Sequence, residues 1–134
     1  MDYYKSIEEA IYTYISANYK NRKIIEVGIG KNPDIFFSLQ KNGFDVSAVD
    51  IKTNLPDYGE NFHQDDVFEP DISLYNGCNL IYSVRPGIEM IPSLVNIAKE
   101  AGSELIVYHL GNEIYQNGGE KIECGVILNR YYKP

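Results

Sequence analysis

Short apolar segments rich in β-branched residues alternate with segments of helical periodicity, and this alternation constrains the fold more than any other feature of the chain. Helices are predicted at residues 4–19, 33–41 and 87–101. Strands are predicted at 23–27, 44–50, 79–84 and 104–110, with a weaker one at 61–64 and one or two more within 121–132. Strands that alternate with helices form mostly parallel sheets with helices on both faces. We therefore expect an α/β, doubly wound, mostly parallel Rossmann-like sheet.

Length and charge narrow the class of protein further. A chain of 134 residues has the length of one domain, so we expect a single domain over residues 1–134. No apolar segment approaches the roughly 20 residues that cross a bilayer, and no basic segment precedes an apolar leader, so a cytoplasmic protein is expected. The net charge of −7 disfavours nucleic acid as a partner. A small-molecule ligand is the favoured partner.

The segment from Lys23 to Lys41 predicts a strand, a glycine turn and a helix. Gly28 and Gly30 allow a sharp turn and a close approach of the backbone to a ligand. Asn32 is predicted as the N-cap of the helix, with Pro33 at the first helical position. The free N–H groups of such a helix favour an anion or a carboxylate. In an open parallel sheet, the ligand binds where this turn lies, at the carboxyl ends of the strands.

Two classes of cofactor use this geometry, and the sequence distinguishes them in part. A dinucleotide site requires a third glycine or alanine in G-x-G-x-x-G/A, where this chain has Pro33. That departure disfavours NAD and FAD. Asp50 follows about 20 residues after the turn, where either class places an acid for the ribose hydroxyls.

The segment Glu26-Val27-Gly28-Ile29-Gly30 resembles the first motif of class I S-adenosylmethionine-dependent methyltransferases. The resemblance implies that Glu26, Gly28, Gly30 and Asp50 bind this cofactor, and that Asp65 or Asp66 lies near the adenine amino group. Adjacent residues of an extended segment point in opposite directions, so at most one of the two aspartates is expected to face the cofactor. The methyltransferase pattern commonly has glycine where this chain has Asn32, so the match is partial.

Nearly the whole chain is similar to uncharacterised protein family 0146, a family of small archaeal, methyltransferase-like proteins. The similarity lies in Glu26 to Pro33, in Asp65-Asp66-Val67-Phe68-Glu69-Pro70-Asp71 and in Leu80-Ile81-Tyr82-Ser83-Val84-Arg85-Pro86. It implies a minimal methyltransferase-like fold. It implies no particular activity.

Residues at the ends of the later strands are candidates for contact with a methyl acceptor. Arg85 could bind a carboxylate or phosphate with two hydrogen bonds, or pair with Glu89. Tyr82 could stack on a flat substrate, or belong to the core, and Ser83 is its neighbour. His109 could act as an acid or base at the end of its strand.

Several alternatives remain at the level of function. The chain could be a methyltransferase, a non-catalytic S-adenosylmethionine- or nucleotide-binding module, a scaffold subunit or, less favoured, a dinucleotide-binding protein. A homodimer or a partner subunit could complete a pocket in so short a chain. Residues 125–128 could form a covered edge strand or a dimer contact. Two cysteines and an acidic segment without the spacing of a known metal loop predict no metal site.

Overall fold

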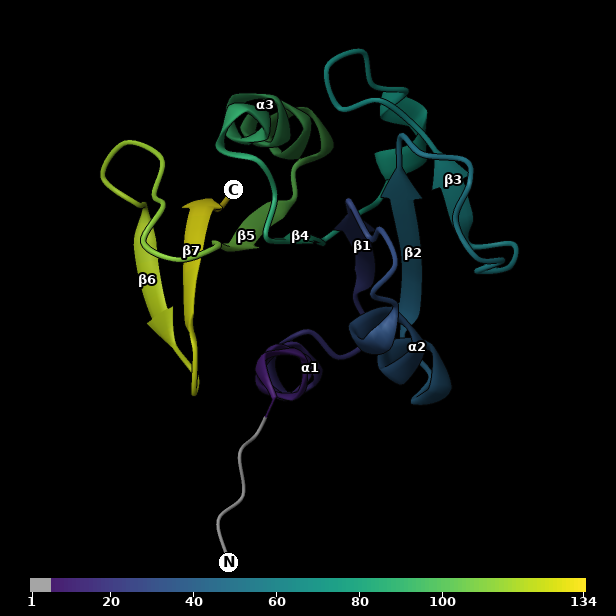
Figure 1. Cartoon of the computed structure of the whole chain (residues 1–134), viewed down its shortest axis with the longest axis horizontal. Helices are drawn as coiled ribbons and strands as arrows, with labels where there is room; N and C mark the ends of the chain where they lie inside the picture. The colour runs from purple at the N-terminus through teal and green to yellow at the C-terminus, as the bar shows by residue number, and fades with distance from the viewer. Residues whose placement is uncertain (1–5) are drawn as a thin grey trace, which may run out of the picture.

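The computed structural model describes residues 6–134 and has a seven-stranded mixed sheet at its centre (Figure 1). Its strands are β1 (Lys23–Val27), β2 (Asp45–Asp50), β3 (Phe62–Gln64), β4 (Leu80–Val84), β5 (Glu104–Tyr108), β6 (Glu120–Glu123) and β7 (Ile127–Tyr132). They lie in the order β3-β2-β1-β4-β5-β7-β6. The first five pair in parallel, and β7 is antiparallel to both of its neighbours. The predicted doubly wound, mostly parallel sheet is confirmed.

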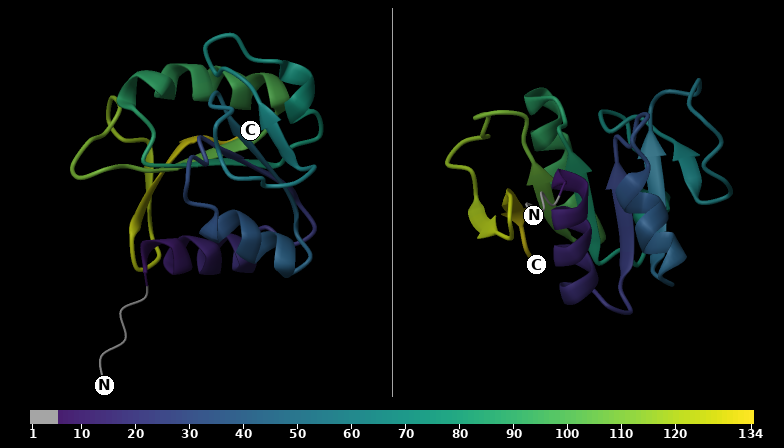
Figure 2. Two further views of the ribbon diagram at one scale, coloured as in Figure 1. Left: turned by 45° about the vertical axis from the view of Figure 1, so that its right-hand side comes forward. Right: turned by 60° about the horizontal axis from the view of Figure 1, so that its bottom comes forward.

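Helices cover both faces of the sheet (Figures 1 and 2). On one face lie α1 (Ile7–Asn18) and α2 (Asp34–Lys41); on the other lie α3 (Ile91–Ala101) and the 3-10 turn η1 (Ile72–Tyr75). Successive side chains of a strand point to opposite faces. Ile24 of β1 accordingly packs in the apolar cluster beneath α1 and α2, whereas Ile25 packs in the cluster beneath α3.

The first two helices differ from the predictions at their starts. α1 begins at Ile7, where the Oγ atom of the N-cap Ser6 accepts a hydrogen bond from the Glu9 N–H at 3.0 Å. The predicted start at Tyr4 lies outside the described residues. The prediction of Asn32 as the N-cap of α2 is wrong, because Pro33 occupies that position and its carbonyl accepts the first helical bond, from the Phe37 N–H at 2.8 Å.

Three later predictions also need correction. The helix expected over residues 87–101 divides into a 3-10 turn, η2 (Ile88–Met90), and α3, because Pro92 lacks an N–H and is tolerated only in the first turn of an α-helix. β5 ends at Tyr108 rather than at Leu110, which is exposed. Residues 127 and 128 belong to β7, which lies between β5 and β6, so this segment is not an edge strand.

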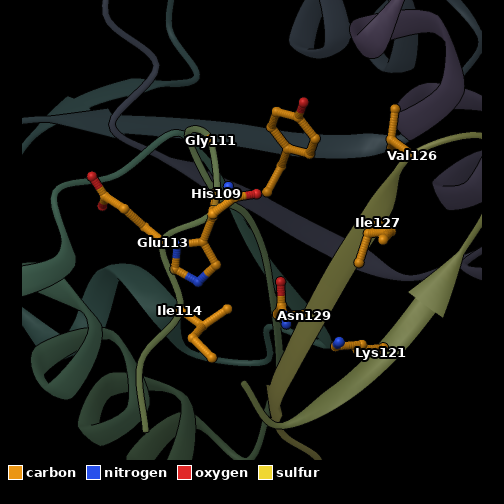
Figure 3. Close-up of a pocket in the computed structure, with 10 residues that line it drawn as sticks. His109, Gly111, Glu113, Ile114, Lys121, Val126, Ile127 and Asn129 are labelled. Carbon is orange, nitrogen blue, oxygen red and sulfur yellow. The ribbon is translucent and has the colours of Figure 1, made fainter. Parts of the chain in front are cut away.

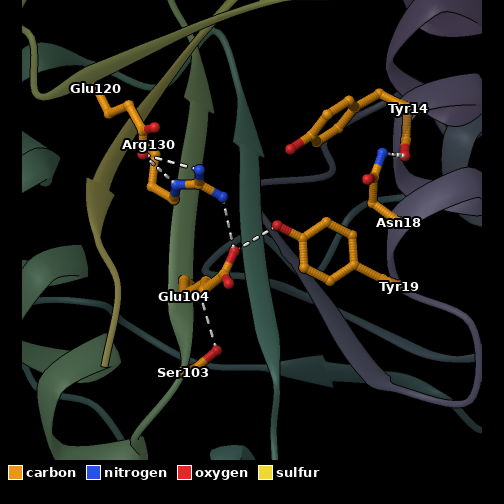
Figure 4. Close-up of polar contacts among 7 residues, drawn as sticks. All are labelled: Tyr14, Asn18, Tyr19, Ser103, Glu104, Glu120 and Arg130. Atoms are coloured by element: carbon orange, nitrogen blue, oxygen red, sulfur yellow. Dashed lines mark hydrogen bonds and ion pairs between the residues drawn. The ribbon is translucent and has the colours of Figure 1, made fainter.

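A polar network connects the C-terminal hairpin to the rest of the sheet at the end opposite the glycine turn (Figure 4). The Arg130 guanidinium pairs with Glu104 at 3.2 Å and with Glu120 at 2.8 Å, which joins β7 to β5 and β6. The Tyr19 hydroxyl, at the end of α1, donates to the same Glu104 carboxylate. Because both ion pairs share one guanidinium, the hairpin has a fixed position relative to β5.

Candidate functional site

The glycine turn predicted after β1 is present, and its backbone requires glycine. Gly28 has a φ of +78° and Gly30 a φ of +56°, in the left-handed region that side chains with a Cβ disfavour. The turn is fixed by a hydrogen bond from the Gly28 N–H to the Val49 carbonyl at 2.7 Å. The Tyr58 hydroxyl donates to the Gly30 carbonyl at 2.6 Å from the loop between β2 and β3.

Asp50, the last residue of β2, organises this turn. One carboxylate oxygen accepts from the Gly30 N–H at 2.8 Å and the other from the Lys52 N–H at 2.9 Å. The side chain is only 8% exposed. A carboxylate offers about four acceptor positions, so two hydrogen bonds to the backbone leave capacity for a ligand.

Glu26 lies on the face of the sheet that α1 and α2 cover. It is 2% exposed, and its Oε1 atom accepts from the Tyr82 hydroxyl at 2.6 Å. The pKa of Glu26 is raised to about 8, chiefly by burial and in small part by the nearby Glu8, while the Tyr82 hydrogen bond opposes the shift. Tyr82 is 1% exposed, so its ring belongs to the core and offers no surface for a substrate.

Arg85 follows β4 and has a strained backbone, with a φ of +55°. Its N–H donates to the Tyr108 carbonyl at 2.6 Å, and its guanidinium lies 5.3 Å from the centroid of the Tyr108 ring. The guanidinium pairs with Glu8 of α1 at 3.3 Å, rather than with Glu89. Three contacts with β5 and α1 therefore hold this residue beside the glycine turn.

A cavity of about 240 Å³ opens where β1, β2, β3 and β4 end, and we name it the strand-end cavity. Its lining includes four residues predicted from the sequence, Gly28, Asp50, Asp65 and Arg85. The other predicted site residues, Glu26, Gly30, Asp66, Tyr82, Ser83 and His109, do not line it.

The residues outside the strand-end cavity have contacts of their own. Asp66 turns away from the cavity, and its Oδ1 atom accepts from the Phe68 N–H at 2.9 Å. Only one of the two adjacent aspartates, Asp65, therefore lines the cavity. Ser83 donates to the Val27 carbonyl at 2.7 Å and lies beneath the glycine turn.

His109 lines a second cavity of about 480 Å³, between the loop after β5 and the β6–β7 hairpin, which we name the hairpin cavity (Figure 3). Asn129 of β7 and Lys121 of β6 line it from the hairpin, and Ile114 and Ile127 supply apolar walls. Burial lowers the pKa of His109, so the imidazole is neutral near pH 7.

Sequence reasoning missed several contributors to the strand-end cavity. Ile51 lines the cavity, directly follows Asp50 and is 56% exposed. An apolar residue directly after the acid that ends a strand is a sequence signal that could have identified it. Val67 and Met90 line the cavity from segments distant in sequence. Glu8 contacts both Arg85 and the Asn32 amide, each at 3.3 Å, and no local pattern around Glu8 indicates this.

No helix within residues 6–134 is both long and apolar enough to cross a bilayer. Over the same residues, no three His, Cys, Asp or Glu side chains are placed to hold a metal ion together.

The sheet order and the glycine turn define a methyltransferase-like Rossmann fold, which solved structures share. An S-adenosyl-L-methionine methyl transferase from Silicibacter pomeroyi aligns with a TM-score of 0.55 and 12% identity over 92% of this chain and 88% of that one. The glycopeptide N-methyltransferase MtfA, solved with S-adenosyl-L-homocysteine, aligns with a TM-score of 0.53 and 13% identity over 100% of this chain and 68% of MtfA. The methyltransferase CcbJ from Streptomyces caelestis aligns with a TM-score of 0.52 and 12% identity. The alignment covers 75% of this chain and 47% of CcbJ, so this chain spans about half of that protein. At such identities the likeness shows the fold alone.

The chain belongs to the uncharacterised protein family UPF0146, which it matches over residues 7–124. A UPF0146 protein of Archaeoglobus fulgidus is 35% identical over 94 residues, or 70% of this chain and 72% of the relative. The Pyrococcus abyssi relative is 43% identical over 90 residues, which are 64% of this chain and 69% of that protein. The Methanocaldococcus jannaschii relative is 38% identical over 97 residues, which are 69% of this chain and 70% of that protein.

Proposed function

We propose that this protein binds S-adenosylmethionine in the strand-end cavity and transfers its methyl group to a small molecule. One observation carries the proposal: Gly28, Asp50, Asp65 and Arg85, which lie at the ends of four different strands, line a single cavity. The cavity lies at the carboxyl ends of parallel strands, where open α/β sheets bind their ligands. Its volume of about 240 Å³ is just below the roughly 300 Å³ at which ordinary ligand pockets begin, so the cofactor would extend to the surface.

The residues that line the strand-end cavity suit the parts of this cofactor. Ile51, Val67 and Met90 offer apolar surface to the adenine ring. Asp50 retains acceptor capacity for the ribose hydroxyls. Asp65, whose two oxygens both accept from the single Asp71 N–H, at 3.0 and 3.3 Å, can accept a further hydrogen bond from the adenine amino group.

The start of α2 is unsuited to a pyrophosphate. Asp34 occupies the first turn of α2, where a phosphate of a dinucleotide would otherwise bind. Glu8 contacts Asn32 in the loop that precedes that helix. Pro33, the N-cap, has no N–H to donate. These features disfavour a dinucleotide, whereas S-adenosylmethionine has no pyrophosphate to place there.

The bound cofactor supplies an electrophilic methyl group on its sulfonium. The chain itself then has to align an acceptor and exclude water, and such alignment can account for a large part of a rate enhancement without an acid–base pair. Arg85, which lines the strand-end cavity and is held by Tyr108 and Glu8, is the residue best placed to position an acceptor.

A non-catalytic S-adenosylmethionine-binding module is the second candidate. The size of the strand-end cavity favours it, because about 240 Å³ leaves little room for an acceptor beside a bound cofactor. Turnover distinguishes the two candidates.

Calorimetric titration with S-adenosylmethionine, S-adenosylhomocysteine and NAD tests the proposal. We expect micromolar binding of the first two and none of NAD. Asp65→Asn should weaken binding about 10- to 100-fold, as expected for a hydrogen bond to a charged group. The matched control Asp57→Asn lies on an exposed turn outside the cavity and should bind normally. Absence of binding at millimolar S-adenosylmethionine would refute the proposal.

A further inference from the structure

The hairpin cavity has the features of a second ligand site. It is about 480 Å³ in volume, within the range of small-molecule pockets, which run from about 300 to 1,000 Å³. Ile114 and Ile127 line it with side chains that are about half exposed, an unusual environment for large apolar residues. Leu110, more exposed still, belongs to the same loop as Ile114. Exposed apolar side chains that gather around a concave surface indicate a binding site.

A buried polar group points into the hairpin cavity. Asn129 is 4% exposed, and its Nδ2 atom donates to the Gly118 carbonyl at 2.7 Å. The Oδ1 atom has no hydrogen-bond partner among the described residues, and Figure 3 shows it directed into the space between Ile127 and His109. A carboxamide oxygen accepts up to two hydrogen bonds, so this atom can accept one from a ligand in the cavity.

The walls of the hairpin cavity are pre-formed. The Tyr131 hydroxyl accepts from the Tyr115 N–H at 2.9 Å and lies 2.6 Å from the His109 Nε2 atom. The contact between the Tyr131 hydroxyl and Nε2 orients the imidazole, and burial lowers the pKa of His109, so the ring is neutral near pH 7. These bonds hold the loop after β5 against β7. The neutral ring presents an uncharged wall.

Arg85 and Tyr108 place the two cavities next to each other. Arg85 lines the strand-end cavity, Tyr108 lines the hairpin cavity, and the guanidinium lies 5.3 Å from the centre of the Tyr108 ring. A ligand in either cavity therefore contacts one member of a single stacked pair, so the two sites are neighbours at the same edge of the sheet.

We propose that the hairpin cavity binds the methyl acceptor, a flat, uncharged compound with an apolar ring and one N–H or O–H donor. Ile114 and Ile127 contact the ring, and Asn129 Oδ1 accepts from the donor. The opposite charges of Glu113 and Lys121 at the cavity compensate each other and do not select an ion. The acceptor role rests on the proposed function, whereas the binding site does not.

Indole serves as the probe, because it is flat and has one N–H, and 1-methylindole serves as its donor-free control. We expect indole to shift the NMR signals of the Asn129 side-chain amide and of the Ile114 and Ile127 methyl groups, with millimolar or tighter affinity. 1-Methylindole should bind about five- to tenfold more weakly, since one hydrogen bond is lost.

Two matched variants assign each ligand to its cavity. Ile127→Thr removes apolar surface from the hairpin cavity and should weaken indole binding severalfold without changing S-adenosylhomocysteine binding. Ile51→Thr makes the same change in the strand-end cavity and should have the opposite pattern. Both isoleucines are about half exposed, so neither variant opens the core.

The outcomes separate the two proposals. No indole binding, or binding that Ile127→Thr leaves unchanged, would overturn the hairpin site. If indole binds as expected but no S-adenosylhomocysteine binds, the proposed function fails and the acceptor role fails with it. If both bind, S-adenosylhomocysteine should change the indole affinity by at least twofold, and indole should reciprocally change the cofactor affinity by the same factor. Fully independent binding would overturn the acceptor assignment.

Discussion

The buried Glu26 carboxyl provides a quantitative test of the electrostatics beneath the glycine turn. Burial is the largest cause of its raised pKa, about 8 compared with 4.5 for the same group in water. The Tyr82 hydroxyl stabilises the charged form and only partly offsets the burial. The folded protein therefore retains a proton on Glu26 near pH 7, whereas the unfolded chain has released it.

This difference fixes the sign of the pH dependence. Between pH 5 and pH 8 the folded state binds more protons than the unfolded state, so stability falls as the pH rises. A difference of one unit between the folded and unfolded pKa corresponds to about 1.4 kcal/mol in the free energy of unfolding. With a folded pKa of about 8 and an unfolded value of 4.5, the wild type loses about 3–4 kcal/mol through this one group between pH 5 and pH 8.

Glu26→Gln removes the titration while it keeps the size of the side chain and an oxygen that accepts from Tyr82. We expect the stability difference between Glu26→Gln and wild type to grow by about 3–4 kcal/mol in favour of the variant from pH 5 to pH 8. Urea unfolding at four pH values measures it, and subtraction removes the contribution of the other groups. The control Glu60→Gln, at an exposed position, should follow wild type. A difference that does not change with pH would refute the reasoning.

Three further perturbations test the surrounding geometry. Tyr58→Phe removes the hydrogen bond to the Gly30 carbonyl and should lower the free energy of unfolding by about 1 kcal/mol, measured as a lower Tm. An unchanged Tm would mean that this loop does not support the glycine turn. Arg85→Gly should be more stable than Arg85→Ala by about 1 kcal/mol in urea unfolding, because a φ of +55° disfavours a Cβ, and equal stabilities would contradict the strain. Since burial lowers the pKa of His109, the stability of wild type relative to His109→Gln should fall as the pH falls below about 6.5.

The parallel part of the fold could be predicted because its signals are local. Each of β1, β2 and β4 is a short apolar segment buried on both faces, and the helix that follows β1 or β4 buries one apolar side. The C-terminal hairpin was harder to predict from the sequence, because β6 is mostly exposed and has little apolar pattern. Its placement outside β7 depends on long-range contacts such as the Arg130 ion pairs, which sequence periodicity does not encode.

The part of the strand-end cavity that could be predicted from the sequence is the part formed by residues at the ends of strands. Gly28, Asp65 and Arg85 each follow a strand and Asp50 is the last residue of one, so topology alone places them at one edge. Glu26 and Tyr82 precede the ends of their strands and are directly paired across β1 and β4, which places both beneath α1 and α2 instead. The pairing register was not available from the sequence, so their burial together could not be foreseen.

The N-terminal helix is part of the candidate site as well as a cover for the core. Glu8 of α1 contacts the Asn32 amide in the loop after the glycine turn and the Arg85 guanidinium after β4, each at 3.3 Å. Since Arg85 is partly exposed, this ion pair contributes little to stability. Its effect is on position, because the guanidinium that stacks on Tyr108 is held at the boundary between the two cavities. A movement of α1 would therefore displace Asn32 and Arg85 together, which couples this helix to the loop after the glycine turn and to the strand-end cavity.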